Sequence, residues 1–396
     1  MVDIGMNLQS VYYWTSEHPF IDRMKTSATW SAEGLPYGTP VPLDANGYPL
    51  SVPSGAIQVS TAIDLDPASA GTSRVYELTW SGTGNISVLG TRVLSSQPGK
   101  IVFAYDGEDT WARLDVSGLS AADPLTAIHV VRQDQVALFD AGEIFNPALL
   151  DHASQWSTLR FKDWNHTDGG AAADWQQSNT LDSASWSNGL GVPIEVEVAL
   201  ANKTHTDMWI NIPTEADDAY VRDTLGYIKA HLDPGLTVKV EYSNEVWNWS
   251  YAQSHYALAM GDQLWGRDAN RDGRIDAEDP AEHVADGWMR YYGYRAAQVA
   301  AIAHDVFADQ PDRVDTVVET QTAYAGMEEA IMRGAAAADV GSTSALFDSW
   351  AVNAYFGIEF DGLTAADRAQ VLTWAGAGQA GMTAAFHELE FGGAGM

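Results

Sequence analysis

The chain has 396 residues, no Cys, and 53 Asp and Glu against 21 Lys and Arg, which gives a formal net charge of −32. A hydrophobic fraction of 46% is sufficient for a packed core and excludes a disordered chain, and the lack of Cys excludes disulfides and thiolate chemistry. The acidity argues against nucleic acid, anionic membranes and polyanionic substrates as partners, since all of these require clustered cations.

The first 140 residues divide into two patterns. Residues 1–35 begin with a strand-like segment at 4–11 and continue into a helical stretch around 20–25. In residues 36–140, Gly, Pro, Ser and Thr separate short alternating runs such as 75–80 and 100–105. Short strands at regular spacing predict a small β-sandwich, inserted after the first strand.

From residue 141 onward the pattern alternates between strands and helices, which predicts a parallel sheet. The expected strands are 157–162, 208–212, 237–242, 313–319 and 347–354, and the main helices are 217–232, 288–307 and 327–338. With segment 4–11 this makes six strands. We therefore expect an α/β fold, a (β/α)8 TIM-type barrel truncated after its sixth strand. Its parts would be the first β/α unit at 1–35, the inserted β-sandwich-like domain at 36–140 and the remainder at 141–396.

The strongest indication of a site is the run Glu241-Tyr242-Ser243-Asn244-Glu245-Val246-Trp247, where a strand ends in Asn-Glu. Catalytic residues of barrels lie at the C-terminal ends of strands. A carboxyl group next to Trp247 and Trp249 would be partly desolvated and kept protonated, as a general acid requires. Asn244 would bind a sugar hydroxyl. The alternative is a structural Glu that caps the following helix.

Here the sequence resembles clan A of the glycoside hydrolases, whose members are retaining enzymes on (β/α)8 barrels with Asn-Glu at the end of the fourth strand. The resemblance covers residues 1–35 and 141–360. It includes Gly5-Met6-Asn7-Leu8 with Trp14, the segments 159–164 and 209–213, and the segments 144–147 and 351–357, which are similar to poorly characterised bacterial members of the clan.

The resemblance implies that Glu245 is the general acid/base and that Arg160 is the arginine of the clan. Arg160 would hold the nucleophile ionised, or would instead form a structural ion pair with Asp163. The nucleophile belongs about 5 Å from the acid, at the end of a seventh strand, and we expect it beyond residue 396. Glu390 and Glu319 are weaker candidates, and Glu319 is alternatively an internal carboxyl group paired with Arg160.

Further side chains are placed in the cleft by their positions after strands. Gln321 and Tyr324 follow the fifth strand, and Tyr355 ends the sixth. Tryptophans that would stack on sugar rings, or alternatively belong to the core, are Trp164, Trp247, Trp249 and Trp350.

The segment 268–279 matches the calcium-loop template D-x-[DN]-x-[DN]-G. The expected ligands are Asp268, Asn270, Asp272, the carbonyl of Arg274, Asp276 and Asp279. The loop resembles EF-hand and dockerin loops, but dockerins carry two repeats and this chain has one. We therefore expect a structural Ca²⁺ that holds a long loop, with a metal-free acidic loop as the alternative.

Other classes of site find no support in the sequence. Paired-His zinc motifs, phosphate-binding Gly-rich loops and the G-x-S-x-G elbow are absent. There is no stretch of about 18 apolar residues that would span a membrane, and the first residues do not resemble a signal peptide. We expect a secreted monomer whose signal is not part of this chain, although a cytoplasmic location fits the same observations.

The sequence thus favours a glycoside hydrolase acting on β-linked poly- or oligosaccharides by a retaining two-carboxylate mechanism. The first alternative is a carbohydrate-binding protein without the nucleophile, and the second is a calcium-stabilised adhesion protein. A second carboxylate within about 5–6 Å of Glu245 distinguishes the enzyme from the binding protein.

The calcium assignment predicts a dependence of stability on the ion. A chelator should lower the melting temperature and leave the fold unchanged, because a ligand bound only by the folded state stabilises that state. Differential scanning calorimetry with and without Ca²⁺ measures this effect, and identical melting curves would contradict the assignment.

Overall fold

The computed structural model describes residues 4–66, 74–107, 112–168, 178–265, 287–322, 326–353 and 373. The chain divides into a unit of residues 1–352, which holds nearly all of the described elements, and a unit of residues 353–396. No helix within the described ranges is long and apolar enough to cross a membrane.

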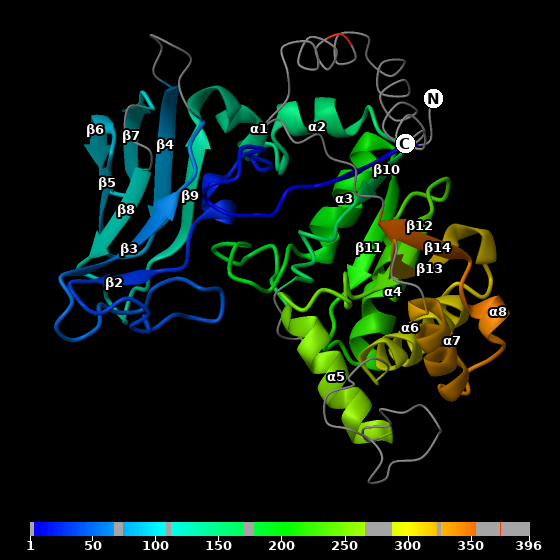
Figure 1. Cartoon of the computed structure of the whole chain (residues 1–396). Helices are drawn as coiled ribbons and strands as arrows, with labels where there is room; N and C mark the ends of the chain where they lie inside the picture. The colour runs from blue at the N-terminus through cyan, green and yellow to red at the C-terminus, as the bar shows by residue number, and fades with distance from the viewer. Residues whose placement is uncertain are drawn as a thin grey trace. The chain divides into compact units, whose positions relative to one another are not determined.

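Two four-stranded antiparallel sheets form a β-sandwich, and their strands are ordered β2-β3-β8-β5 and β6-β7-β4-β9 (Figure 1). The strands are β2 Ser31–Glu33, β3 Gln58–Ile63, β4 Arg74–Ser81, β5 Asn85–Leu89, β6 Arg92–Gln97, β7 Lys100–Tyr105, β8 Ala112–Ser117 and β9 Thr126–Arg132. Since side chains alternate along a strand, each sheet directs every second residue inward. Val59 and Leu114 of one sheet and Leu78 and Phe103 of the other share one core.

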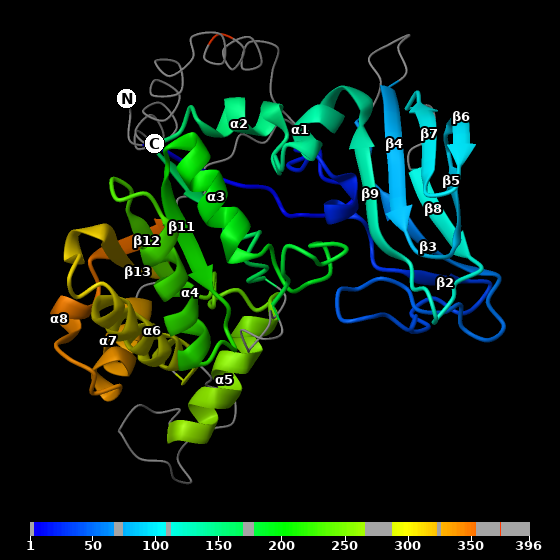
Figure 2. The same ribbon diagram turned by 180° about the vertical axis from the view of Figure 1, so that it is seen from behind.

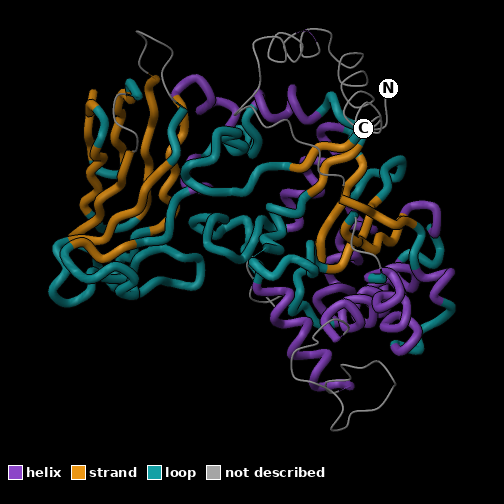
Figure 3. The backbone as a smooth tube through the Cα atoms, viewed as in Figure 1, coloured by secondary structure: helices purple, strands orange, loops and turns teal. Residues whose placement is uncertain are grey.

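The second part is a six-stranded parallel sheet with the order β1-β10-β11-β12-β13-β14. Its strands are β1 Gly5–Asn7, β10 Thr158–Arg160, β11 Asp207–Ile212, β12 Val238–Tyr242, β13 Val314–Gln321 and β14 Ser349–Asn353. Figure 3 shows the strands of the molecule gathered in these two places, with long loop segments between them.

Helices cover one face of the parallel sheet, and α3 and α4 are seen in front of it in Figure 2. The helices are α1 Val136–Asp140, α2 Pro147–Ala153, α3 Ile194–Thr204, α4 Asp218–His231, α5 Ala252–Trp265, α6 Gly287–Val306, α7 Met327–Ala337 and α8 Thr343–Leu346, with 3₁₀ turns η1 Arg23–Thr26, η2 Gln133–Gln135 and η4 Pro311–Arg313. Met208, Ile210, Val238 and Val240 face these helices and are buried.

The opposite face of the parallel sheet is polar. In register across five strands lie Asn7, Arg160, Trp209, Lys239 and Asp315. Partners in a parallel register share a face, so these side chains and Glu241, two residues after Lys239, lie on the same side.

The expected eight-stranded barrel is wrong for the described residues, which form an open parallel sheet of six strands with β1 and β14 at its ends. Closed barrels fill their interior with layers of branched apolar side chains. The face of this sheet that is not covered by helices carries charged and amide side chains instead of branched apolar ones. When such polar groups are buried, they require hydrogen-bonding partners. The helical stretch expected at 20–25 is the single 3₁₀ turn η1.

A short segment anchors the sandwich to the parallel sheet. Phe20 belongs to the core of the sheet, with its ring 4.7 Å from Trp186, whereas Met24 is buried in the core of the sandwich. Between them, the side chain of Asp22 accepts hydrogen bonds from Val130 and from His129 at 3.0 and 2.8 Å. Arg23, completely buried, donates to Asp66 at 2.7 Å.

Two glycines on helices provide a test of the packing. A Cβ atom at Gly334 of α7 would lie 1.8 Å from the carbonyl oxygen of Arg290 on α6, whereas a Cβ atom at Gly226 of α4 would meet nothing within 4 Å. We predict that Gly334→Ala lowers the free energy of unfolding by about 1–3 kcal/mol through overpacking. The control, Gly226→Ala, should raise it by about 0.5–1 kcal/mol through helix propensity. Urea denaturation measures both values, and equal effects of the two substitutions would contradict this packing.

Candidate active site

The turn that follows β12 has an unusual backbone. Ser243 and Glu245 adopt left-handed conformations, with φ angles of +61° and +41°. For residues with a Cβ atom this conformation costs on the order of 1 kcal/mol or more, and it persists only where the surroundings enforce it. Such strain is concentrated at functional sites. Among the described residues, this turn is the one place where two non-glycine residues with positive φ lie within three positions.

Side chains from three elements fix the turn. Asn211 of β11 donates to the carbonyl oxygen of Ser243 at 2.7 Å, and Gln253 of α5 donates to that of Asn244 at 2.9 Å. The backbone N–H of Glu245 points to Oε2 of Glu319, on β13, at 3.5 Å. The side chain of Glu245 is partly exposed and accepts a hydrogen bond from Asn248 at 3.1 Å. Glu245 is therefore held at the end of β12 with its carboxyl group reachable from solvent.

Beneath the turn, Arg160 of β10 is the central cation. One of its terminal nitrogens, Nη2, lies 3.1 and 2.8 Å from the two carboxyl oxygens of Glu241 and 3.2 Å from Oδ1 of Asn244. The guanidinium is also 3.9 Å from Glu319 and lies over the ring of Trp209, 4.9 Å from its centroid. The indole N–H of Trp209 donates to Glu241 at 2.8 Å. The expected alternative partner, Asp163, pairs instead with Lys162 at 3.3 Å.

Glu319 and Glu241 form a pair of buried carboxyl groups joined by a hydrogen bond. Burial raises the pKa of Glu319 to about 10, and the charge and hydrogen bond of Glu241 act in the same direction, while Arg160 opposes them. Because Glu241 accepts from both Arg160 and Trp209, the shared proton belongs on Glu319. Glu319 therefore keeps its proton near neutral pH, and Arg160 is the cation that contacts Glu241.

The rim of the site is a polar track between the turn and the loop after β10. Asn244 donates to Asp168 at 2.7 Å, and Asp168 pairs with Lys162. Burial raises the pKa of Tyr251, and the charges of Asp168 and Glu245 raise it further. The rim thus contains donors and acceptors suited to a hydroxylated ligand.

The other residues predicted from the sequence have different positions. Trp164 is completely buried between Phe20 and Phe161, and Trp247 is 6% exposed, so both serve in packing and are not available as stacking surfaces. This corrects the cleft position expected for them. Trp249 is 42% exposed. Gln321 is half-buried at the end of β13. Tyr324, Tyr355 and Glu390 lie outside the described residues.

The calcium loop also falls outside the described residues, because all of 266–286 does so. Within the part of the chain that is described, no group of three or more acidic or His side chains is arranged to hold a metal ion. The expected Ca²⁺ site therefore stays a prediction that rests on the sequence template alone.

Sequence reasoning missed Glu241, Trp209 and the pair Lys162–Asp168. A signal for Glu241 was present, because it follows Lys239 by two residues in the strand and so shares its face. A carboxyl residue in a strand that is mostly Val and Tyr requires a partner, and Arg160 of the nearby strand β10 was an available cation.

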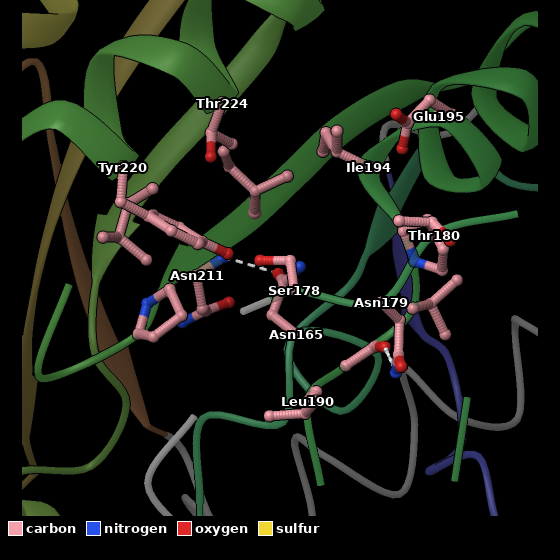
Figure 4. Close-up of a pocket in the computed structure, with 16 residues that line it drawn as sticks. Asn165, Ser178, Asn179, Thr180, Leu190, Ile194, Glu195, Asn211, Tyr220 and Thr224 are labelled. Carbon is pink, nitrogen blue, oxygen red and sulfur yellow. Dashed lines mark hydrogen bonds between the residues drawn. The ribbon is translucent and has the colours of Figure 1, made fainter. Parts of the chain in front are cut away.

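A second concavity of about 310 Å³ lies between the loops after β10 and β11 and the helices α3 and α4 (Figure 4). Asn211, Asn165, Tyr220 and Thr224 line it, and Glu195 is the one carboxyl residue among its described lining residues. Such a lining provides hydrogen bonds to a neutral molecule but not a pair of carboxyl groups.

No protein-family model, curated protein or solved structure matches the chain. The assignment of a function therefore depends on the geometry of the site.

The carboxyl pair predicts how stability depends on pH. The unfolded chain loses the Glu319 proton near its ordinary pKa of 4.5, whereas the folded chain keeps it to about 10. The stabilisation is complete below 4.5 and is lost as the pH rises to about 10, by at most about 1.4 kcal/mol per pH unit for one proton. Glu319→Gln retains a donor for Glu241 but does not ionise, so its free energy of unfolding should decline less with rising pH. Urea denaturation between about pH 5 and pH 9 measures the slopes.

The control is Glu329→Gln on α7, where the side chain is 70% exposed. This variant should keep the slope of the unaltered protein. A Glu319→Gln slope equal to that of the control would contradict a protonated Glu319.

Proposed function

We propose that the chain is a glycoside hydrolase that acts on β-linked poly- or oligosaccharides, with Glu245 as the general acid/base of a retaining mechanism. The observation that carries the proposal is the strained turn after β12, which holds the partly exposed carboxyl group of Glu245 at the end of the strand. In α/β folds with parallel strands, catalytic groups lie at this end.

The local chemistry supports this role for Glu245. A general acid has to protonate the oxygen of the departing sugar, and it requires a fixed direction and contact with the substrate. Asn248 fixes one carboxyl oxygen of Glu245. Asn244, Asp168 and Lys162 provide hydrogen-bonding groups beside it. Neutral sugars suit such a rim, because the net charge of −32 repels anionic ligands.

The retaining mechanism requires a second carboxylate, and without one the protein would bind carbohydrate but not hydrolyse it. A nucleophile has to be ionised and about 5 Å from the acid. Among the described residues, Glu319 is in direct contact with the backbone of Glu245, but it holds the proton of the pair. Glu241 is completely buried and occupied by Arg160 and Trp209. This arrangement favours, as the second candidate, a protein that binds carbohydrate without hydrolysing it.

The first candidate predicts a selective loss of activity in Glu245→Gln. Turnover of β-glycosides with alkyl or sugar leaving groups should fall by about 10²–10⁴-fold, because general acid catalysis contributes that much. Aryl glycosides whose leaving group departs without a proton should lose less in the first step. Reducing-sugar release and nitrophenol release measure the two classes of substrate.

The matched control is Glu143→Gln, which alters a carboxyl group that pairs with Lys203 in an exposed region. Its activity should equal that of the unaltered protein. Full activity of Glu245→Gln on both substrate classes would contradict the role of Glu245. Saccharide binding without hydrolysis by the unaltered protein would support the second candidate.

A further inference from the structure

Two hollows beside the site share one aromatic wall. Tyr12 and Trp14, in the loop after β1, stack with their ring centroids 4.7 Å apart and their planes within 12°. Trp14 is 65% exposed. Both residues line a hollow of about 480 Å³ with Ser10 and Asp163, and both line a second hollow of about 660 Å³. An exposed Trp14 that stacks on the half-buried Tyr12 thus forms an aromatic surface that the two hollows share.

A series of hydrogen bonds and ion pairs connects the first hollow to the candidate active site. Asp163 accepts from Asn7 at 2.6 Å and from Ser10 at 2.9 Å, and it lies 3.3 Å from Lys162. Lys162 in turn pairs with Asp168, the acceptor of the Asn244 side chain. Asp163, Lys162 and Asp168 thus link Asn244, next to Glu245, to the hollow that Tyr12 and Trp14 line.

The β-sandwich forms the opposite side of the second hollow. Ser31 of β2 and Ser60 of β3 are register partners, and their hydroxyl groups are 3.0 Å apart. Arg113 of β8 donates to Glu33 at 3.2 Å. Tyr37, in the loop after β2, is fully exposed at the same hollow. Hydroxyl groups, an ion pair and exposed aromatic rings thus converge here from two parts of the fold.

These features fit a pyranose sugar. Its C–H face packs on a flat aromatic ring, and its rim of hydroxyl groups exchanges hydrogen bonds with Ser, Asp and Arg side chains. The excess of carboxylates opposes a negatively charged glycan.

We propose that the two hollows bind consecutive sugar units of a neutral polysaccharide whose scissile bond lies at Glu245, so that the β-sandwich supplies the distal part of the substrate groove. This inference rests on the proposed function. It specifies that the substrate is a polysaccharide and that the enzyme cleaves its internal glycosidic bonds.

The test is the dependence of binding on ligand length. Isothermal titration calorimetry of the full chain carrying Glu245→Gln, which limits turnover, would use the disaccharide and the hexasaccharide of β-linked glucose, xylose and mannose. For at least one sugar the hexasaccharide should bind more tightly than the disaccharide. Adding Trp14→Ala should weaken binding of that hexasaccharide roughly three- to tenfold and leave the disaccharide unchanged, since one aromatic contact contributes on that order. Tyr37→Ala should act in the same direction.

The matched control is Tyr227→Ala, which removes an aromatic ring that stacks on His231 on α4. It should leave the affinity for both ligands unchanged, and thermal melting would establish that all variants are folded. Equal affinity for the two lengths, no binding of any sugar, or no effect of Trp14→Ala on the hexasaccharide overturns the groove. The groove is supported if the hexasaccharide binds more tightly than the disaccharide and Trp14→Ala weakens the binding of the hexasaccharide. This result would stand even if the unaltered protein hydrolyses nothing and the proposed activity is wrong.

Discussion

One guanidinium compensates the buried charge on the polar face of the parallel sheet. Arg160 contacts Glu241 and Asn244 directly and lies 3.9 Å from Glu319, so residues of β10, β13, β12 and the turn after β12 meet at a single cation. Burial by itself lowers the pKa of Arg160, but Glu241 and Glu319 raise it above its ordinary value, so the group keeps its charge. Cations are scarce in this chain, with 21 Lys and Arg against 53 Asp and Glu. The position of this one is therefore a strong constraint on the fold.

The carboxyl pair connects this charge balance to the turn. Glu319 faces the backbone N–H of Glu245, and its own backbone N–H donates to the hydroxyl group of Tyr292 at 2.8 Å. Buried polar groups that pair with one another restrict the surrounding backbone, because a rearrangement would leave a partner unsatisfied. The left-handed conformations of Ser243 and Glu245 are then enforced by the contacts below them, and the turn sets the direction of the Glu245 side chain.

Local patterns in the sequence predicted the elements but not how they assemble. The buried strands β11 and β12 and the helices α4, α6 and α7 were found within a few residues, because apolar periodicity and flanking turn residues determine them locally. The turn at Glu245 was found from a dipeptide at a strand end. The six strands were counted correctly, but the (β/α)8 barrel was predicted wrongly, because alternation of strands and helices fits an open parallel sheet as well as a barrel. Trp164 could not be placed, since its burial depends on Phe20, which is distant in sequence.

The position of the sandwich in the chain has a consequence for the site. The sandwich follows β1 in the chain. The chain therefore leaves the parallel sheet at the carboxyl ends of its strands, the end at which β12 presents Glu245. Phe20 is fixed in one core and Met24 in the other, and only Ile21, Asp22 and Arg23 lie between them. The loop that carries Tyr12 and Trp14 is consequently held between β1 and this anchor, with little freedom to move away from the edge. Two cores thus position one aromatic surface, and the sandwich contributes residues to a hollow that Tyr12 and Trp14 line.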